Sequence, residues 1–332
     1  MKVLGIGFNC VDIIRTNQIE TITAGGTCTN VLAMLSSWGI ETSLLLPNYC
    51  KDDAFEFFLN DITKKNVKYI LYKKTNKPFS VIIQENFCED HRFLTSCPKC
   101  GNPTINSISF NEIDAQKNID VLKKSNILFC DRFSQGIKYL SEICHKKNIL
   151  TFYEPNNCRF YNTQLEAIKN FDIVKFSNSR IGEKTSEKLK KDLSNSRIKL
   201  IIVTLGNEGL KFSIRQGDRL SDWIEIKSSF GNDAVDSSGA GDCLTAAIIY
   251  SILYNQNYNK KDFSAHWLHE ILNKAQMISS INCGCVGAQG ILYDAKSFEM
   301  SCNILNACIP STNHKHTTKP YKFHCSNCNN LL

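Results

Sequence analysis

The chain has 332 residues, of which 42% are hydrophobic and 21% are charged, with 39 lysines and arginines against 32 aspartates and glutamates. This composition is typical of a folded protein with one large α/β domain or two smaller ones. The net charge of +7 is scattered, with no arginine-rich block or basic stripe, which argues against a nucleic-acid partner. No apolar run is long enough for a membrane span, and no signal peptide is recognisable. We therefore expect a cytoplasmic protein with no membrane partner.

Short apolar runs that suit buried strands alternate with longer amphipathic segments. In chain order, strands are expected at 3–7, 42–46, 79–83, 126–130, 149–153, 172–176 and 200–204, and helices at 29–39, 140–147 and 242–253. Several of these strands are apolar throughout, as in strands covered on both faces. The alternation predicts an α/β domain of three layers, αβα, with a mostly parallel central sheet. Ligands of such sheets bind at the carboxyl ends of the strands.

The stretch Ser238-Gly239-Ala240-Gly241-Asp242 directly precedes a strongly apolar helical run. A helix N-terminus has unpaired N–H groups and a partial positive charge, and small residues leave both accessible. Such a turn can cradle a phosphate or the charge of a phosphoryl group in transfer. A carboxylate there suits removal of a proton from an attacking hydroxyl. The alternative is a tight glycine loop in which Asp242 only caps the helix.

The segment "DSSGAGD" at 236–242 resembles the C-terminal signature of the ribokinase-like (PfkB) carbohydrate kinases. Further similarities follow in the family's order, and all fall within residues 1–295: "GFNCVD" (7–12), "AGGTCTNVLAMLSSWG" (24–39), "KDDAF" (51–55, without the flanking glycines), "TLGNEG" (204–209) and "CVGAQG" (285–290). The resemblance implies a ribokinase-like fold and phosphorylation of a hydroxyl on a small sugar-like substrate. ATP and Mg²⁺ would be required, and a homodimer is compatible with the family.

The same resemblance assigns roles to individual residues. Asp242 would be the general base, and the N–H groups of Gly239, Ala240 and Gly241 would form the anion hole. The other implied sites are Asp12, Gly25, Gly26 and Asn30 for the substrate, Thr204, Gly206, Gly209 and Gly287 for the nucleotide, and Asp236 and Ser238 for a monovalent cation such as K⁺.

One motif departs from the family. An Asn-x-x-Glu segment usually organises the magnesium, and the corresponding stretch here is "VKFSNSRIGE". If Lys175 is aligned with the usual lysine, Ser177 replaces the Asn and Arg180 replaces the Glu. A shifted alternative uses Asn178 and Glu183. Because of this departure, an alternative is that the protein is a catalytically impaired relative that binds sugar or nucleotide, or acts as an assembly protein. Among substrates, a sugar is favoured and a nucleoside remains an alternative.

The lid over the sugar is expected to be reduced or atypical. We predict a kinase domain at 1–300, with lid segments at 17–24 and 73–110 and a tail at 301–332; one short strand is expected between Asp12 and Gly25. The lid and the tail each contain a Cys-x-x-Cys pair, and the chain has 16 cysteines. The hypothesis is one structural zinc held by Cys97, Cys100, Cys325 and Cys328, with His324 and Cys88 as reserve ligands. Two unrelated thiol pairs or a redox pair are the alternatives.

Overall fold

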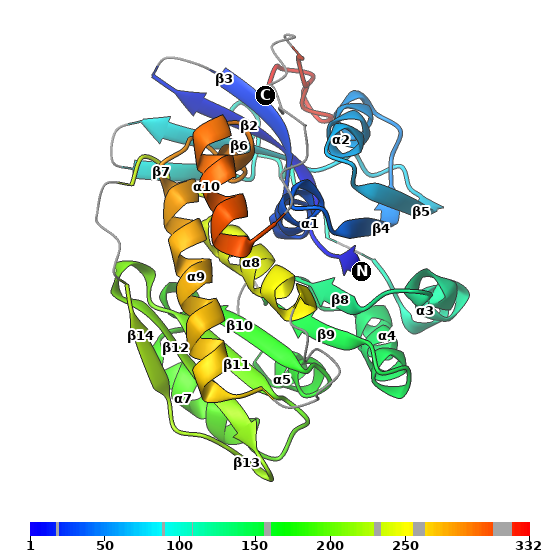
Figure 1. The fold of residues 1–332 in the computed structure, drawn as a ribbon. Coiled ribbons are helices and arrows are strands. Elements are labelled where there is room, and N and C mark those ends of the chain that lie inside the picture. Colours follow the sequence, from blue (N-terminus) through cyan, green and yellow to red (C-terminus); the bar gives the residue numbers. More distant parts are fainter. Residues whose placement is uncertain are drawn as a thin grey trace.

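A ten-stranded sheet forms the centre of the computed structural model (Figure 1). The structure describes residues 1–17, 20–87, 90–107, 109–155, 161–228, 234–254, 263–307 and 321–332. The strands of this sheet are β1 (Lys2–Ile6), β4 (Glu41–Tyr49), β5 (Lys68–Lys74), β8 (Ile127–Cys130), β9 (Leu150–Tyr153), β10 (Ile173–Ser177), β11 (Leu200–Thr204), β12 (Gly209–Gln216), β13 (Arg219–Leu220) and β14 (Ile224–Lys227). Their order is β13-β12-β11-β10-β9-β8-β1-β4-β5, and β14 also pairs with β12. Pairing is parallel from β5 to β11 and antiparallel from β11 onward, which confirms the mostly parallel sheet.

Helices cover both faces of this sheet (Figure 1). One layer contains α1 (Thr27–Ser37), α2 (Asp53–Lys64), α8 (Ala240–Tyr254), α9 (Ala265–Cys283) and α10 (Ala295–Leu305). The other contains α3 (Glu112–Lys117), α4 (Gln135–Lys146), α5 (Tyr161–Ile168), α6 (Asn178–Ile181) and α7 (Glu183–Asp192). Ile127 and Phe129 of β8 face the first layer, whereas Leu128 and Cys130 face the second. This alternation explains why the central strands are apolar throughout. None of the described helices has both the length and the apolar character needed to cross a bilayer.

A second, four-stranded sheet forms the lid. Its strands are β3 (Glu20–Gly25), β2 (Cys10–Thr16), β6 (Val81–Phe87) and β7 (Asp90–Leu94), in the order β3-β2-β6-β7. The one short strand expected between Asp12 and Gly25 is β3, but β2 begins before Asp12 and places that residue in the lid itself. The run 79–83, which resembles the central strands in composition, belongs to the lid as the start of β6. The lid segment predicted at 73–110 also includes the end of β5, which is an edge strand of the central sheet.

A buried ion pair fastens the lid to α2. The Nζ atom of Lys65 lies 2.6 Å from the Asp61 carboxylate, and the two side chains are only 2% and 8% exposed. The same carboxylate accepts a hydrogen bond from the N–H of Ala24 in β3 (2.8 Å), and Lys65 also donates to Gln289 (2.6 Å). Gln289 in turn donates to the Ala24 carbonyl (2.7 Å) and to the side chain of Asn30 in α1 (2.8 Å). Four separate segments are therefore joined through two buried charges.

Replacing Lys65 by methionine tests this connection. Lys65→Met leaves the Asp61 carboxylate buried without its cation, so we expect the free energy of unfolding to fall by roughly 3–5 kcal/mol. Urea unfolding followed by circular dichroism measures the change. The matched control is Lys68→Met, because Lys68 pairs with Glu41 at 2.9 Å in an exposed position and should cost less than about 1 kcal/mol. Equal losses for the two variants would contradict the role given to the buried pair.

Candidate active site

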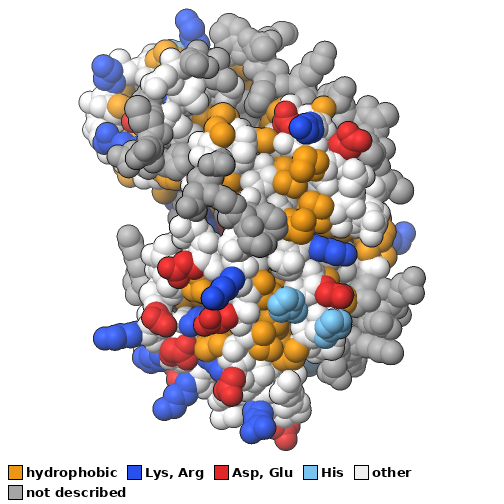
Figure 2. All heavy atoms as spheres, turned by 60° about the vertical axis from the view of Figure 1, so that its left-hand side comes forward, with side chains coloured by type: hydrophobic (Ala, Val, Ile, Leu, Met, Phe, Trp, Pro, Cys, Tyr) orange, Lys and Arg blue, Asp and Glu red, His pale blue; other side chains and the backbone are white. Residues whose placement is uncertain are grey.

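A cavity of about 1510 Å³ lies between the lid and the carboxyl ends of the central strands. Its wall is formed by residues of β2 and β6, the segment 93–107, the residues that follow β10 and β11, and the N-terminus of α8. Figure 2 shows the molecular surface hollowed between an upper and a lower part, with acidic and basic side chains interspersed on the lower part. The cavity occupies the position at which open α/β sheets bind their ligands.

Most of the residues predicted for the site line this cavity. The lining includes Asp12, Gly26, Asn30, Thr204, Gly206, Gly209, Ser238, Gly239, Ala240, Gly241 and Asp242. Gly25, Asp236 and Gly287 lie outside the lining. Gly25 lies directly against Asp12, since a Cβ there would be 1.8 Å from the Asp12 carboxylate. Gly287 donates to Asp236 (2.8 Å), which accepts from the N–H of Ser238 (2.7 Å).

The turn before α8 has the geometry that its small residues predict. Gly239 has φ +70°, and a Cβ there would be 2.2 Å from the carbonyl oxygen of Ala288. Only glycine suits this combination of backbone angle and close approach. Since the helix starts at Ala240, the N–H groups of Gly241 and Asp242 have no acceptor within it. The N–H of Ala240 makes a long bond of 3.3 Å to the carbonyl of Ser237.

Asp242 is the carboxylate at this helix start. Its Oδ2 accepts a hydrogen bond of 2.6 Å from the Asn30 side chain. Burial raises the pKa of Asp242 to about 6, and the nearby charge of Glu154 acts in the same direction. The hydrogen bond from Asn30 and the charges of Lys175 and Arg180 partly oppose this shift. A carboxyl group with such a pKa can exchange a proton close to neutral pH.

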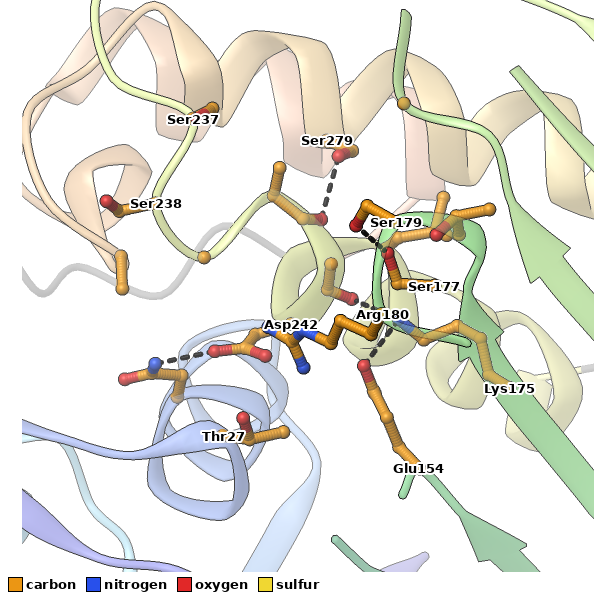
Figure 3. Close-up of a pocket in the computed structure, with 18 of the residues that line it drawn as sticks. Thr27, Glu154, Lys175, Ser177, Ser179, Arg180, Ser237, Ser238, Asp242 and Ser279 are labelled. Carbon is orange, nitrogen blue, oxygen red and sulfur yellow. Dashed lines mark hydrogen bonds and ion pairs between the residues drawn. The ribbon is translucent and has the colours of Figure 1, made fainter. Parts of the chain in front are cut away.

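Lys175 and Glu154 form a buried ion pair below the turn (Figure 3). Their charged atoms are 2.6 Å apart, and the side chains are 3% and 10% exposed. Lys175 also donates to the carbonyl of Gly241 (3.0 Å), and Thr245 donates to Glu154 (2.7 Å). The pair therefore connects β10 and the residue after β9 to the first two turns of α8.

The segment expected to organise magnesium has the departure seen in the sequence. Ser177, which ends β10, shares a hydrogen bond of 2.7 Å with Ser179. Arg180 lines the cavity, and Figure 3 shows its side chain extending toward Asp242. Of the shifted pair, Asn178 lines the cavity, but Glu183 is exposed at the start of α7 and lies outside the lining. Of the residues named for the two alignments, Ser177, Asn178 and Arg180 line the cavity and Glu183 does not.

The lid side of the cavity contains Asp12. Its Oδ1 accepts a hydrogen bond from the thiol of Cys10 (3.2 Å), and burial raises its pKa to about 6. Two residues at the site that were not predicted from the sequence are Asp131 and Arg132. They form an ion pair of 2.8 Å, and the guanidinium lies 4.7 Å from the centre of the Phe8 ring. Arg132 lines the cavity. The sequence could have indicated both residues, because they are the first polar residues after the buried strand β8 and ligands bind at the carboxyl ends of such strands.

The four cysteines of the two Cys-x-x-Cys pairs form a cluster outside the lining of the cavity. All four Sγ atoms lie within 4.8 Å of one another, with 3.8 Å between Cys97 and Cys328 and 3.7 Å between Cys100 and Cys325. The proposed reserve ligand Cys88 lies outside the described residues. The other, His324, has its Nδ1 3.1 Å from the carbonyl of Asn329 and is not a member of the cluster.

The tail that carries the second pair packs on α2 and on the lid. The rings of Tyr321 and Phe323 lie 4.7 Å and 5.8 Å from the ring of Phe57. Leu332 is buried, and its carbonyl accepts a hydrogen bond of 3.0 Å from Arg15 of β2. The fold thus brings together two segments more than 200 residues apart in the sequence.

Comparison with known proteins places these features in a family. Residues 10–294 match the profile of the pfkB family carbohydrate kinases. A curated relative, "Putative fructokinase-8" of Arabidopsis thaliana, is 27% identical over 132 residues, which are 38% of this chain and 60% of that protein. The match thus spans three-fifths of the length of this relative.

Solved structures share the fold. An uncharacterized sugar kinase from Pyrococcus horikoshii in complex with ATP has 19% identity and a TM-score of 0.62, covering 90% of this chain and 99% of that chain. Adenosine kinase from Sinorhizobium meliloti has 18% identity and a TM-score of 0.69, with coverages of 90% and 99%. Ribokinase from Giardia lamblia has 13% identity and a TM-score of 0.69, with the same coverages.

The raised pKa of Asp242 predicts a pH-dependent cost to stability. Between pH 4 and 6 the folded protein keeps this carboxyl protonated, whereas an unfolded aspartate is ionised, so the folded state becomes less stable as the pH rises. Asp242→Asn removes this contribution. Relative to the parent, the variant should therefore gain about 1–3 kcal/mol of unfolding free energy between pH 4 and pH 7.

Urea unfolding at both pH values measures the gain. Asp218→Asn, at an exposed position, serves as the control and should shift stability equally at the two pH values. A constant difference between Asp242→Asn and the parent would contradict the raised pKa.

Proposed function

Because this chain belongs to the pfkB family of carbohydrate kinases, we propose that it transfers the γ-phosphoryl group of ATP to a hydroxyl of a small sugar-like substrate. One observation carries the proposal. The carboxylate of Asp242 lies at the glycine-rich start of α8 and faces the same cavity as Asp12 and Asn30. The cavity thereby brings together a base, a helix start that can bind an anion, and polar groups for a hydroxylated ligand.

In the proposed reaction, Asp242 accepts the proton of the attacking hydroxyl. The hydroxyl oxygen forms a bond to the γ-phosphorus as the bond from that phosphorus to the β-phosphate oxygen breaks, and ADP leaves. The N–H groups of Gly239, Ala240 and Gly241 would stabilise the charge on the transferred group. A pKa of about 6 supports the role of Asp242, because the group is mostly ionised at neutral pH yet basic enough to take a proton.

On the lid side, Asp12 and Asn30 would hold hydroxyl groups of the substrate. A carboxylate accepts hydrogen bonds and a carboxamide both donates and accepts them, which suits adjacent hydroxyls. Asn30 already bonds to Asp242, so the same side chain can orient the base and the substrate. Gly25 and Gly26 would allow the chain to approach the sugar closely, since neither has a side chain in the way.

On the other side, Thr204, Gly206 and Gly209 would line the nucleotide, and Gly287 would support this end through its bond to Asp236. Mg²⁺ would arrive with ATP, bound mainly by phosphate oxygens and water. Arg180 cannot accept a hydrogen bond from a metal-bound water. Its guanidinium can instead pair with phosphate oxygens, and we assign it part of the neutralisation of charge during transfer.

The four-cysteine cluster fits a structural zinc. Zn²⁺ bound by four thiolates at about 2.3 Å in a tetrahedron separates the sulfurs by about 3.8 Å, which agrees with the 3.8 Å between Cys97 and Cys328 and the 3.7 Å between Cys100 and Cys325. N–H groups of Lys99, Asn102 and Asn330 lie 3.3–3.4 Å from the sulfurs, as expected around thiolates. Such a metal would fasten the tail to the segment that follows β7, and so to the wall of the cavity.

The proposed activity predicts ADP release from MgATP with one class of acceptor. A panel of sugars, sugar acids, phosphosugars and nucleosides, assayed with a coupled ADP readout, would identify it. We expect Asp242→Asn to lower kcat by at least about 10³-fold, because it removes the base. Below pH 6 the parent enzyme should lose activity as Asp242 becomes protonated.

Two outcomes would count against this proposal. Turnover that survives Asp242→Asn would exclude this residue as the base. ATP binding by calorimetry without turnover of any acceptor would instead favour a nucleotide-binding relative, with Arg180 as the residue that ended catalysis.

The zinc proposal predicts one zinc per chain. Protein purified without chelator should contain it by elemental analysis, and Cys328→Ser should lose it together with several degrees of Tm. Cys302→Ser is the control, because Cys302 is a buried thiol of α10 outside the cluster and its replacement should leave the zinc content unchanged. Metal-free parent protein with an undiminished Tm would refute a structural zinc.

A further inference from the structure

Two carboxamides of lid strand β6 contact the turn that precedes α8. The side-chain nitrogen of Gln84 donates to the hydroxyl of Ser238, and that of Asn86 donates to the Asp236 carboxylate at 2.7 Å. Gln84 also donates to the carbonyl oxygen of the Asn86 side chain (2.9 Å). Residues two apart in a strand face the same side, so the register of β6 places both carboxamides against the turn.

The Asp236 carboxylate is surrounded by hydrogen-bond donors. Its Oδ1 accepts from the N–H of Ser238 (2.7 Å), and its Oδ2 accepts from the N–H of Gly287 (2.8 Å) and from Asn86. A monovalent cation needs oxygen ligands with free lone pairs, whereas an N–H group offers none. N–H groups thus occupy three of the about four lone-pair sites of Asp236, so this carboxylate is a poor ligand for the cation that the family resemblance implied for Asp236 and Ser238.

We propose that Gln84 and Asn86 are positioning residues that hold the 236–242 turn in place of a monovalent cation. The inference rests on the proposed function, in which this turn receives the phosphoryl group. A carboxylate with three N–H donors has its charge stabilised without a metal, and the donors fix the direction of the turn. The side-chain N–H of Asn86, which belongs to the lid, makes the contact with Asp236 that a cation would otherwise make.

The same contacts connect the turn to the substrate side. Strand β6 pairs with β2 so that Ile82 lies beside Asp12 and Gln84 beside Ile14. The strand that bonds to the turn is thus the neighbour of the strand that carries Asp12. Displacement of the lid would break the bonds to Ser238 and Asp236 and leave the turn less ordered. The position of the lid and the order of the anion hole are therefore coupled.

The first test is the cation dependence of the parent enzyme. We expect rates within about twofold when Na⁺ or tetramethylammonium replaces K⁺ at constant ionic strength. Asn86→Asp places a second carboxylate against Asp236, and like charges in contact repel. This variant should lose activity at least tenfold in tetramethylammonium and regain most of it in K⁺. A parent enzyme that K⁺ activates tenfold or more would overturn the proposal.

The second test does not depend on turnover. Amide hydrogen exchange of residues 236–242 should become at least tenfold faster in the double variant Gln84→Ala/Asn86→Ala. Glu85→Gln is the matched control, because Glu85 lies on the same strand with its side chain on the opposite face and should leave exchange in the turn unchanged. A Tm close to that of the parent identifies variants that remain folded.

The two proposals can fail separately. Faster exchange in the double variant, with no acceptor phosphorylated by the parent, would support the positioning role and reject the kinase activity. Parent-like exchange in a folded double variant would reject the positioning role even if the enzyme is active. For an active enzyme, kcat should fall about 10- to 100-fold in the double variant, as expected for loss of a hydrogen bond to a charged group, while KM for ATP changes little.

Discussion

The contact on which the site depends is the 2.6 Å hydrogen bond between Asn30 and Asp242. It joins the first helix after the lid to the helix whose start forms the anion-binding turn. Asn30 is oriented by Gln289, which is held by Lys65. Asn30, Gln289 and Lys65 are buried, where a polar group without a partner is costly, so each side chain fixes the next. These linked hydrogen bonds therefore favour a single conformation of the site.

The lid is held to the rest of the molecule at three places by different chemistry. The ion pair of Asp61 and Lys65 binds β3 to α2, and the carboxamides of β6 contact the turn before α8. The four-cysteine cluster brings the tail to the segment after β7. A lid sheet of four short strands has little core of its own. Its buried apolar side chains, which include Val11, Ile13 and Ile83, instead pack into the main core, and the polar and sulfur contacts add to this packing.

The Lys175–Glu154 pair and Arg180 surround Asp242 with charged side chains. Glu154 lines the cavity, but its carboxylate is paired with Lys175 and accepts a hydrogen bond from Thr245. The cationic side chains of Lys175 and Arg180 lie near Asp242, and both lower its pKa against the effect of burial. Positive charge from the protein is thus concentrated beside Asp242.

The sequence by itself determined the layered fold and the composition of the turn before α8. Both depend on local rules, since buried strands need continuous apolar runs and a close backbone approach at a positive φ needs glycine. The motif order also located Asp12, Asn30 and Asp242. Tertiary structure alone decided that Gln84 and Asn86 meet Asp236 and Ser238, that Lys65 supports Gln289, and that Glu183 lies outside the cavity lining. Such contacts join residues far apart in the chain. The sequence around a single carboxamide or lysine does not indicate which distant residue it contacts. The pairing of the two Cys-x-x-Cys segments was a hypothesis from residue type, and only the fold brought their sulfurs within 4.8 Å.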